Sequence, residues 1–358
     1  MTKDICILAG ARPNFIKVSP LVRAIDQRPE ANCVLVYAGS ADDPTLEPSL
    51  FDDLQIDRPQ YYLGVVSTSL NEITSQVMAQ FDRFLDEHPI DVVIVVDDLA
   101  STMAAAIVTK KRGICLAHLV AGTRSFDITM PKEINRLVID ALSDYLFTAG
   151  VRSTGVATRE QSEQSQTYMV GNILMDTLRF NRDRLRRPAC LEGIEDGRYL
   201  VFTINRRVLL ANEENLRLMV RAIRRAAGDI PIIAPLRSSA TEVISSELSS
   251  AGSRLIITPP LSYLEFGWLA AHALGVITDS GNVAEETTFN GVPCITLNNY
   301  TEHQETVTVG SNVLVGEDPG KLQEAVAQLV GGQWKHSALP DRWDGRTAER
   351  ILQILLLG

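Results

Sequence analysis

The chain has 358 residues, which is too long for one ordinary hydrophobic core and favours two domains. Its formal net charge of −10 argues against nucleic acid or an anionic membrane surface as the main partner. The five cysteines and five histidines lack metal-ligand spacing, so we expect neither a metal site nor a cofactor. No apolar stretch approaches membrane-spanning length, and the first residues lead directly into a short strand. We therefore expect a cytoplasmic protein without membrane insertion.

The first half of the chain alternates short apolar runs with amphipathic helical patterns. This alternation predicts buried parallel strands in one doubly wound sheet. Apolar residues at 134, 137, 138, 141 and 142 predict a helix over 133–146 whose apolar stripe packs on that sheet. Pro20 predicts a kink or a restart in the helix that follows Arg12. The strands are expected at residues 5–9, 33–37, 92–96, 114–119 and 145–148.

A second series of apolar runs follows a further strand near 168–170. The expected division is a Rossmann-like domain over 1–172, a linker helix over 173–190, a nucleotide-binding Rossmann-like domain over 191–346 and a C-terminal helix over 347–358. That last helix is apolar and could pack on either half. Two similar α/β halves favour a ligand in the cleft between them, at the carboxyl ends of the strands. The later strands are expected at residues 199–203, 230–234, 255–258, 275–278 and 293–296.

One turn in the second half has the features of a diphosphate-binding site. Residues 276–286 read V-I-T-D-S-G-N-V-A-E-E, so a strand runs through a turn of small residues into a helix. The first N–H groups of a helix have no intrahelical acceptor and lie at the positive end of its dipole, so Ser280, Gly281 and Asn282 can hold a diphosphate. Glu286 can then accept hydrogen bonds from a ribose diol. The alternative is an ordinary helix N-cap.

Several short motifs follow one another in a recognisable order. Residues 10–17 read G-A-R-P-N-F-I-K, residues 97–102 read D-D-L-A-S-T, residues 118–125 read H-L-V-A-G-T-R-S and residues 131–136 read P-K-E-I-N-R. Together with the turn at 279–286 and Thr301-Glu302, they resemble the non-hydrolysing UDP-N-acetylglucosamine 2-epimerases. That family has the motifs G-T-R-P-E-x-I-K, G-D-T-x-x-T, H-V-E-A-G-L-R-T and P-E-E-x-N-R, and its fold is of the glycosyltransferase-B type.

The resemblance implies a UDP-sugar substrate, with Ser280 and Gly281 at the diphosphate and Glu286 at the ribose. It also implies that Arg12 lies beside the phosphates rather than being a solvated loop arginine. We expect Lys17 to be a charge on a helix surface, and we also expect a homodimer. Residues expected around the sugar are Arg124, Lys132, Arg136, Asn205 and Arg237, with internal ion pairs as the alternative for Arg124 and Arg136.

The sequence departs from the family where proton transfer takes place. By the family's route, UDP is eliminated across C1–C2 and added back with the proton delivered to the other face, which requires two acid/base groups. Val120 and Lys132 stand where the family has carboxylates, and Asn205 stands where it has a histidine. A second histidine of the family is replaced around Arg237. Valine and asparagine cannot transfer a proton at neutral pH. Asp98 alone remains of the expected groups.

The catalytic candidates are therefore Asp98, Glu133 and His303, with Asp127 nearby in sequence. For the last three, a surface or capping role is the alternative. We predict a UDP-sugar enzyme that resembles this epimerase family, which interconverts UDP-N-acetylglucosamine and UDP-N-acetylmannosamine, with altered chemistry. The alternatives are a glycosyltransferase that uses a UDP-sugar donor and a nucleotide-sugar-binding protein without catalysis.

Overall fold

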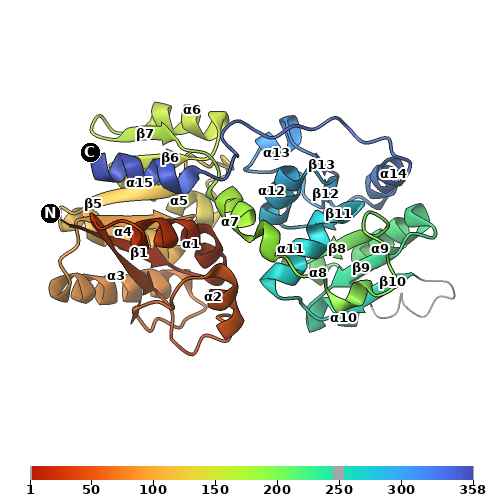
Figure 1. Cartoon of the computed structure of the whole chain (residues 1–358), viewed down its shortest axis with the longest axis horizontal. Coiled ribbons are helices and arrows are strands. Elements are labelled where there is room, and N and C mark those ends of the chain that lie inside the picture. The colour runs from red at the N-terminus through yellow and green to blue at the C-terminus, as the bar shows by residue number, and fades with distance from the viewer. Residues whose placement is uncertain (1, 245–253, 358) are drawn as a thin grey trace. The chain divides into compact units, whose positions relative to one another are not determined.

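The computed structural model describes residues 2–244 and 254–357 and contains two compact units. Unit 1 comprises Met1–Phe180 and Asp341–Gly358, and unit 2 comprises Asn181–Pro340. Each unit has one sheet in which all paired strands are parallel, with helices in the connections (Figure 1). The predicted α/β class with two Rossmann-like domains is therefore confirmed. Within the described ranges, no helix combines the length and apolar character needed to cross a membrane.

Unit 1 has a seven-stranded sheet in the order β3-β2-β1-β4-β5-β6-β7. All five residues of β4 are buried, as the unbroken apolar run predicted. Sequence analysis missed β3, because two tyrosines are too short a run to show a pattern. The strands are β1 (Lys3–Ala9), β2 (Ala31–Tyr37), β3 (Tyr61–Tyr62), β4 (Val92–Val96), β5 (Cys115–Ala121), β6 (Tyr145–Thr148) and β7 (Gln166–Met169). The helices are α1 (Arg12–Asp26), α2 (Pro48–Leu54), α3 (Leu70–Glu87), α4 (Ala100–Lys111), α5 (Pro131–Leu142), α6 (Val151–Glu160), α7 (Ile173–Asn181) and α15 (Thr347–Leu357).

Unit 2 has a six-stranded sheet in the order β10-β9-β8-β11-β12-β13. Its last strand was not predicted, since β13 has only three residues. The strands are β8 (Leu200–Thr203), β9 (Ile232–Pro235), β10 (Leu255–Thr258), β11 (Gly275–Thr278), β12 (Cys294–Thr296) and β13 (Asn312–Leu314). The helices are α8 (Arg207–Ala211), α9 (Glu213–Ala227), α10 (Ser238–Ile244), α11 (Tyr263–Ala271), α12 (Gly281–Asn290), α13 (Glu305–Thr308) and α14 (Pro319–Val330).

Both sheets reverse their strand order at one place. In unit 1 the reversal lies between β1 and β4, and in unit 2 it lies between β8 and β11. Connections on the two sides of such a point leave in opposite directions, so a crevice opens at the carboxyl ends of the two strands. In each unit, the residues directly after these strands are therefore the first place to look for a ligand site.

The expected linker helix over 173–190 is wrong in its length. Helix α7 ends at Asn181, and two short 3₁₀ turns follow, Arg182–Arg184 and Ala189–Leu191. The segment between Asn181 and Pro188 is rich in arginine and offers no continuous apolar stripe for a helix to bury. Pro188 also disfavours helical geometry in the residue before it.

The C-terminal helix belongs to unit 1. In Figure 1, the blue helix α15 lies among the red-to-yellow elements of that unit. The Asp176 carboxylate accepts the N–H groups of Thr347 at 3.0 Å and Ala348 at 2.8 Å, so α7 caps the start of α15. The Trp343 indole donates to the Ala149 carbonyl at 2.9 Å. Sequence analysis left the partner of this helix open, because its stripe fits any apolar surface.

Helix α1 continues as one helix past Pro20, so the restart, one of the two expected outcomes, does not occur there. A proline at this position removes the N–H that would donate to the Ile16 carbonyl. That carbonyl accepts instead from the hydroxyls of Ser19 at 3.3 Å and Thr177 at 2.6 Å. Side-chain donors thus replace the missing backbone hydrogen bond.

The expected orientation of the helix over 133–146 is wrong. Helix α5 ends earlier, at Leu142, and it buries a largely polar face that includes Glu133, Asn135 and Arg136. Residues of the apolar stripe are exposed, with Ile134 at 46% and Leu137 at 38%. Arg136 of this helix pairs with Asp98 in the turn after β4, and this contact holds the polar face inward. The spacing of apolar residues along one helix gives no sign of such a contact.

Candidate functional site

Two turns meet at the reversal point of unit 2. Asp279 directly follows β11, and its buried carboxylate accepts the backbone N–H groups of Asn205 at 2.8 Å and Arg206 at 2.6 Å. One residue earlier, at paired positions of β11 and β8, the hydroxyls of Thr278 and Thr203 are 2.8 Å apart. The turn after β8 is therefore fixed beside the turn after β11. This arrangement places the exposed Asn205 next to the start of α12.

The start of α12 combines a cap with open backbone groups. Ser280 is the N-cap, and its hydroxyl accepts the Val283 N–H at 3.5 Å. The N–H groups of Gly281 and Asn282 lie in the first turn, which has no intrahelical acceptors. No atom lies within 4 Å of the position that a Cβ on Gly281 would occupy. The turn is thus an ordinary cap and at the same time has room for an anion.

Two consecutive glutamates of α12 are buried. Burial, together with the smaller effect of the neighbouring Glu285 charge, raises the pKa of Glu286 to about 8. The Glu285 Oε1 atom lies 3.2 Å from Nδ1 of His303. His303 is therefore joined to a buried carboxylate beside the predicted ribose residue.

We expect the pH dependence of stability to change when Glu286 is replaced by glutamine. Unfolded glutamate titrates near 4.5, whereas folded Glu286 titrates near 8. Between these pH values, the folded chain retains a proton that the unfolded chain has lost. The free energy of unfolding therefore falls as pH rises through this window, by at most about 1.4 kcal/mol per pH unit. Urea denaturation at pH 5, 7 and 9 should show that Glu286→Gln gains stability relative to the wild type as pH rises. Parallel pH profiles would contradict the assigned pKa.

In unit 1, Asp98 is engaged by two cations. Its Oδ2 atom lies 2.8 Å from Nε and 2.6 Å from Nη2 of Arg136, and its Oδ1 atom lies 3.2 Å from Nζ of Lys132. Burial opposes ionisation, but Lys132 and Arg136 outweigh it and hold the pKa of Asp98 below its ordinary value. The predicted proton-transfer group is therefore present, but as a stabilised carboxylate.

Glu133 holds a turn together. Its carboxylate accepts the N–H groups of Ser125 at 2.9 Å and Phe126 at 3.0 Å, and it lies 3.1 Å from Nη1 of Arg136. Burial opposes ionisation, but the hydrogen bonds from Ser125 and Phe126 hold the pKa of Glu133 below its usual value. These contacts are those of a structural carboxylate, which was the alternative for this residue.

Arg124 lies inside unit 1. Only 2% of its side chain is exposed, and it pairs with Asp140 at 2.7 Å and Glu160 at 2.9 Å. Asp140 also lies 2.5 Å from Nδ1 of His118, whose Nε2 contacts the Asp97 carbonyl at 2.9 Å. The two possibilities for Arg124 and for Arg136 were a position around the sugar and an internal ion pair. In the structure, both residues form internal ion pairs. Neither guanidinium is available to a sugar in this conformation.

Lys17 is not a surface charge. It is buried, and its Nζ atom lies 2.6 Å from Oδ1 of Asp97. The Asn14 amide donates to the other oxygen of Asp97 at 2.9 Å. Sequence analysis did not single out Asp97 or Asn14. Two signals were available in the sequence. Asn14 and Lys17 share one helix face at i, i+3 spacing, and two aspartates directly follow a predicted strand.

The remaining predicted residues lie at exposed positions, except for the half-buried Arg12. Arg12 is the first residue of α1, and its Nε atom lies 3.0 Å from Glu47. Arg237 is exposed directly before α10. Asp127 accepts the N–H of Thr129 at 3.0 Å, so it caps its own turn. Lys132 is 59% exposed beside Asp98.

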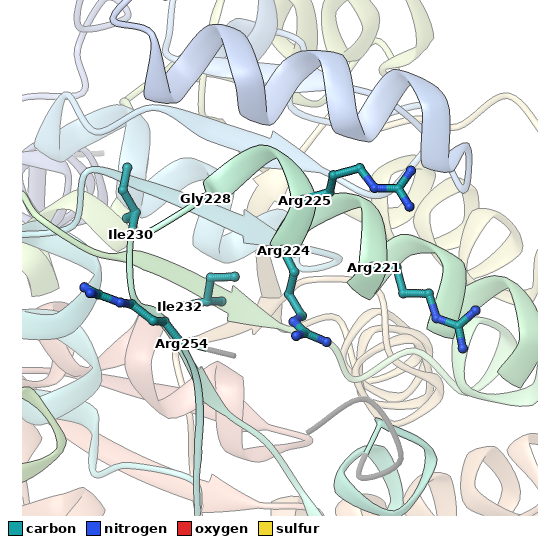
Figure 2. Close-up of a pocket in the computed structure, with 7 residues that line it drawn as sticks. All are labelled: Arg221, Arg224, Arg225, Gly228, Ile230, Ile232 and Arg254. Carbon is teal, nitrogen blue, oxygen red and sulfur yellow. The ribbon is translucent and has the colours of Figure 1, made fainter. Parts of the chain in front are cut away.

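A separate cavity of about 280 Å³ lies at the opposite edge of the unit 2 sheet. Ile232 begins β9 and Arg254 directly precedes β10, so this cavity is at the amino ends of the strands. Figure 2 shows that its other arginines come from α9 and that the guanidinium groups point in different directions. It is thus distinct from the turns described above. Its lining residues are Arg221, Arg224, Arg225, Gly228, Ile230, Ile232 and Arg254.

Comparison with known proteins identifies one family over nearly the whole length of the chain. The sequence profile of the UDP-N-acetylglucosamine 2-epimerase family matches residues 23–356. The chain belongs to this family. It is 31% identical over 365 residues to the UDP-N-acetylglucosamine 2-epimerase of Methanocaldococcus jannaschii, covering 98% of both chains. It is also 31% identical over 331 residues to the UDP-2,3-diacetamido-2,3-dideoxy-D-glucuronate 2-epimerase of Pseudomonas aeruginosa, covering 91% of this chain and 92% of the relative.

A solved structure of the family shares the fold. The M. jannaschii enzyme in complex with UDP-N-acetylglucosamine and UDP superimposes with a TM-score of 0.86 at 31% identity, over 99% of this chain and 100% of that one. The epimerases with these names are isomerases, and they include one that acts on a different UDP-sugar. The predicted family is therefore confirmed.

Proposed function

We propose that this family member binds a UDP-sugar through the turn after β11 and carries out slow, altered proton chemistry at C2 of the sugar. The observation that carries this proposal is the contrast between the two units. In unit 2, the turn at Ser280 and the carboxylate of Glu286 have the geometry expected of a nucleotide site. In unit 1, Asp98 is held as an anion by Lys132 and Arg136.

The binding half of the proposal has two supports. The start of α12 offers first-turn N–H groups and open space at Gly281, which suits a diphosphate. The M. jannaschii relative holds UDP-N-acetylglucosamine and UDP. Arg12 is proposed to lie at the phosphates, where a guanidinium stabilises the charge of the departing diphosphate.

The chemical half follows from what the side chains can do with a proton. Elimination of UDP requires a base that takes the C2 proton, and the return step requires an acid that delivers one to the opposite face. The lowered pKa of Asp98 makes this residue a weak base and leaves little of its acid form at neutral pH. Val120 has no proton to exchange, and Lys132 is paired with Asp98. Slow exchange at C2 is therefore proposed.

Replacing Glu286 by alanine is expected to weaken UDP binding. At pH 9, where most of Glu286 is ionised, the ribose hydroxyls lose a charge-assisted acceptor worth about 1.5–3 kcal/mol, which corresponds to a Kd about 10–150 times higher. Since Glu286 titrates near pH 8, wild-type affinity should also rise between pH 7 and pH 9, as more of the acceptor becomes ionised. Calorimetry with UDP measures both effects.

Asp127→Ala, which removes a self-capping carboxylate from unit 1, is the matched control. Equal affinity of wild type and Glu286→Ala would remove Glu286 from the site.

The other expectations stay predictions. Nothing in the geometry favours glycosyl transfer or a binder without catalysis over the proposed function. A homodimer is supported only by the exposed apolar face of α5, where Ile134 and Leu137 lie in contact with solvent. The cytoplasmic location likewise remains an expectation from the sequence.

A further inference from the structure

The residue that directly follows β4 has an unusual backbone. Asp97 has φ of 61°, in the left-handed region. The family motif G-D-T has glycine at this position, and glycine adopts positive φ without steric cost. Aspartate tolerates this region better than most residues with a Cβ, so it can replace glycine there at a modest steric cost. Position 97 of this chain therefore carries a carboxylate where the family motif has none.

Helix α1 orients both oxygens of this carboxylate. Lys17 lies 2.6 Å from Oδ1 and Asn14 lies 2.9 Å from Oδ2. Asn14 is itself fixed, because its own carbonyl oxygen accepts the N–H groups of Gly10 at 2.9 Å and Ala11 at 3.2 Å. Lys17 and Asn14 are buried, whereas 17% of the Asp97 side chain is exposed. The carboxylate is thus held in one orientation, and the side chain that carries it is partly exposed.

The carboxylate also lies beside the position where one is missing. Strands β4 and β5 are neighbours, and the Asp97 N–H donates to the Leu119 carbonyl at 3.2 Å. Val120 follows Leu119 and has φ of 73°, a conformation that a β-branched residue rarely adopts. The residue types at the adjacent ends of these two strands therefore both differ from the family motifs. Position 120 lacks the expected carboxylate, and position 97 has an additional one.

We propose that Asp97 is a proton-transfer residue of this family member and takes the place of the carboxylate expected at residue 120. This proposal rests on the proposed function. Asp98 and Asp97 are consecutive residues at the reversal point of the sheet, so their carboxylates supply the pair of groups that the reaction requires. Lys17 acts through Asp97 as a positioning residue and as a source of its proton.

In the elimination step, Asp98 takes the C2 proton. The C2–H electron pair forms a C1–C2 double bond, and the C1–O electron pair leaves with UDP. In the return step, a UDP oxygen attacks C1 and the double-bond electrons take a proton from Asp97 at the opposite face of C2. Asp97 receives that proton from the Lys17 ammonium along their 2.6 Å contact. Exchange with water then removes the proton from Asp98 and restores the one on Lys17.

The test compares C2 deuteration of UDP-N-acetylglucosamine in deuterated water, followed by NMR, in the wild type and three variants. Asp97→Asn removes the acid/base group. Lys17→Met with Asp97→Asn also removes the cation, so that no buried charge is left unpaired. Both variants should exchange C2 about 10²–10⁴ times more slowly than the wild type, with unchanged UDP affinity by calorimetry. The matched control is Lys110→Met with Asp144→Asn, which removes another Lys–Asp pair of unit 1, 2.7 Å apart, and should exchange as the wild type does.

The outcomes separate this inference from the proposed function. Wild-type exchange rates in the variant lacking both Lys17 and Asp97 would overturn the role of Asp97. Tight binding of UDP-N-acetylglucosamine by the wild type without any C2 exchange would overturn it as well, while UDP-sugar binding stands. Absence of binding by the wild type contradicts the proposed function itself.

Discussion

Restoring two carboxylates, through Val120→Glu and Lys132→Glu in one chain, is expected to raise the rate of C2 deuteration about 10²-fold or more. A positioned acid/base group typically contributes about 10²–10⁴-fold. The Lys132→Glu change has two effects. It supplies a carboxylate, and it removes the ammonium that lies 3.2 Å from Asp98 and helps to hold the pKa of that residue low. With a negative neighbour instead, the pKa of Asp98 rises towards the working pH.

The control for this variant has the same change in net charge at distant positions. Val66 and Lys111 are exposed, and their replacement by glutamate leaves the turn at Asp98 untouched. This control should exchange C2 as slowly as the wild type. If the variant carrying Glu at 120 and 132 binds UDP-N-acetylglucosamine and still shows no increase, then the side chains at 120 and 132 do not limit the reaction.

Replacing Arg136 by methionine should cost more stability than any other single change considered for this protein. Arg136 bridges Asp98 and Glu133, and all three residues are buried. Removing the cation leaves two carboxylates in a poorly solvated environment, and breaking such a pair costs about 3–5 kcal/mol. We expect the free energy of unfolding, measured by urea denaturation at neutral pH, to fall by that amount.

Arg112→Met is the matched control, because Arg112 also bridges two acidic residues, Asp82 and Asp86. Those carboxylates are largely exposed, so water can solvate them when the cation is lost, and the loss of stability should be much smaller. Equal losses for the two variants would show that Asp98 and Glu133 find another partner or take up protons. A denaturation series at lower pH distinguishes these cases, since protonated carboxyls no longer need the cation.

Local sequence determined most of the strands and the turn at Ser280. The run Val92–Val96 is apolar throughout because both faces of a central parallel strand are covered, so it was recognisable without the structure. The turn at Ser280 was recognisable too, because Ser, Gly and Asn between a strand and a helical pattern are typical of a turn that ends in a helix N-cap. The bounds of β11 were predicted without error for the first of these reasons, and those of β10 were also predicted without error although it is an edge strand.

Only the tertiary structure decided which charges are paired. Arg124, Arg136 and Lys17 have the same local sequence character whether they meet a ligand or a carboxylate, and their partners lie on other elements. Helix α5 shows the physical reason most clearly. Its apolar stripe predicted the buried face, but the ion pairs of Arg136 with Asp98 and Glu133 hold the polar face inward. A buried charge must find its partner in space, and periodicity along one helix carries no information about the turn of a strand 38 residues away.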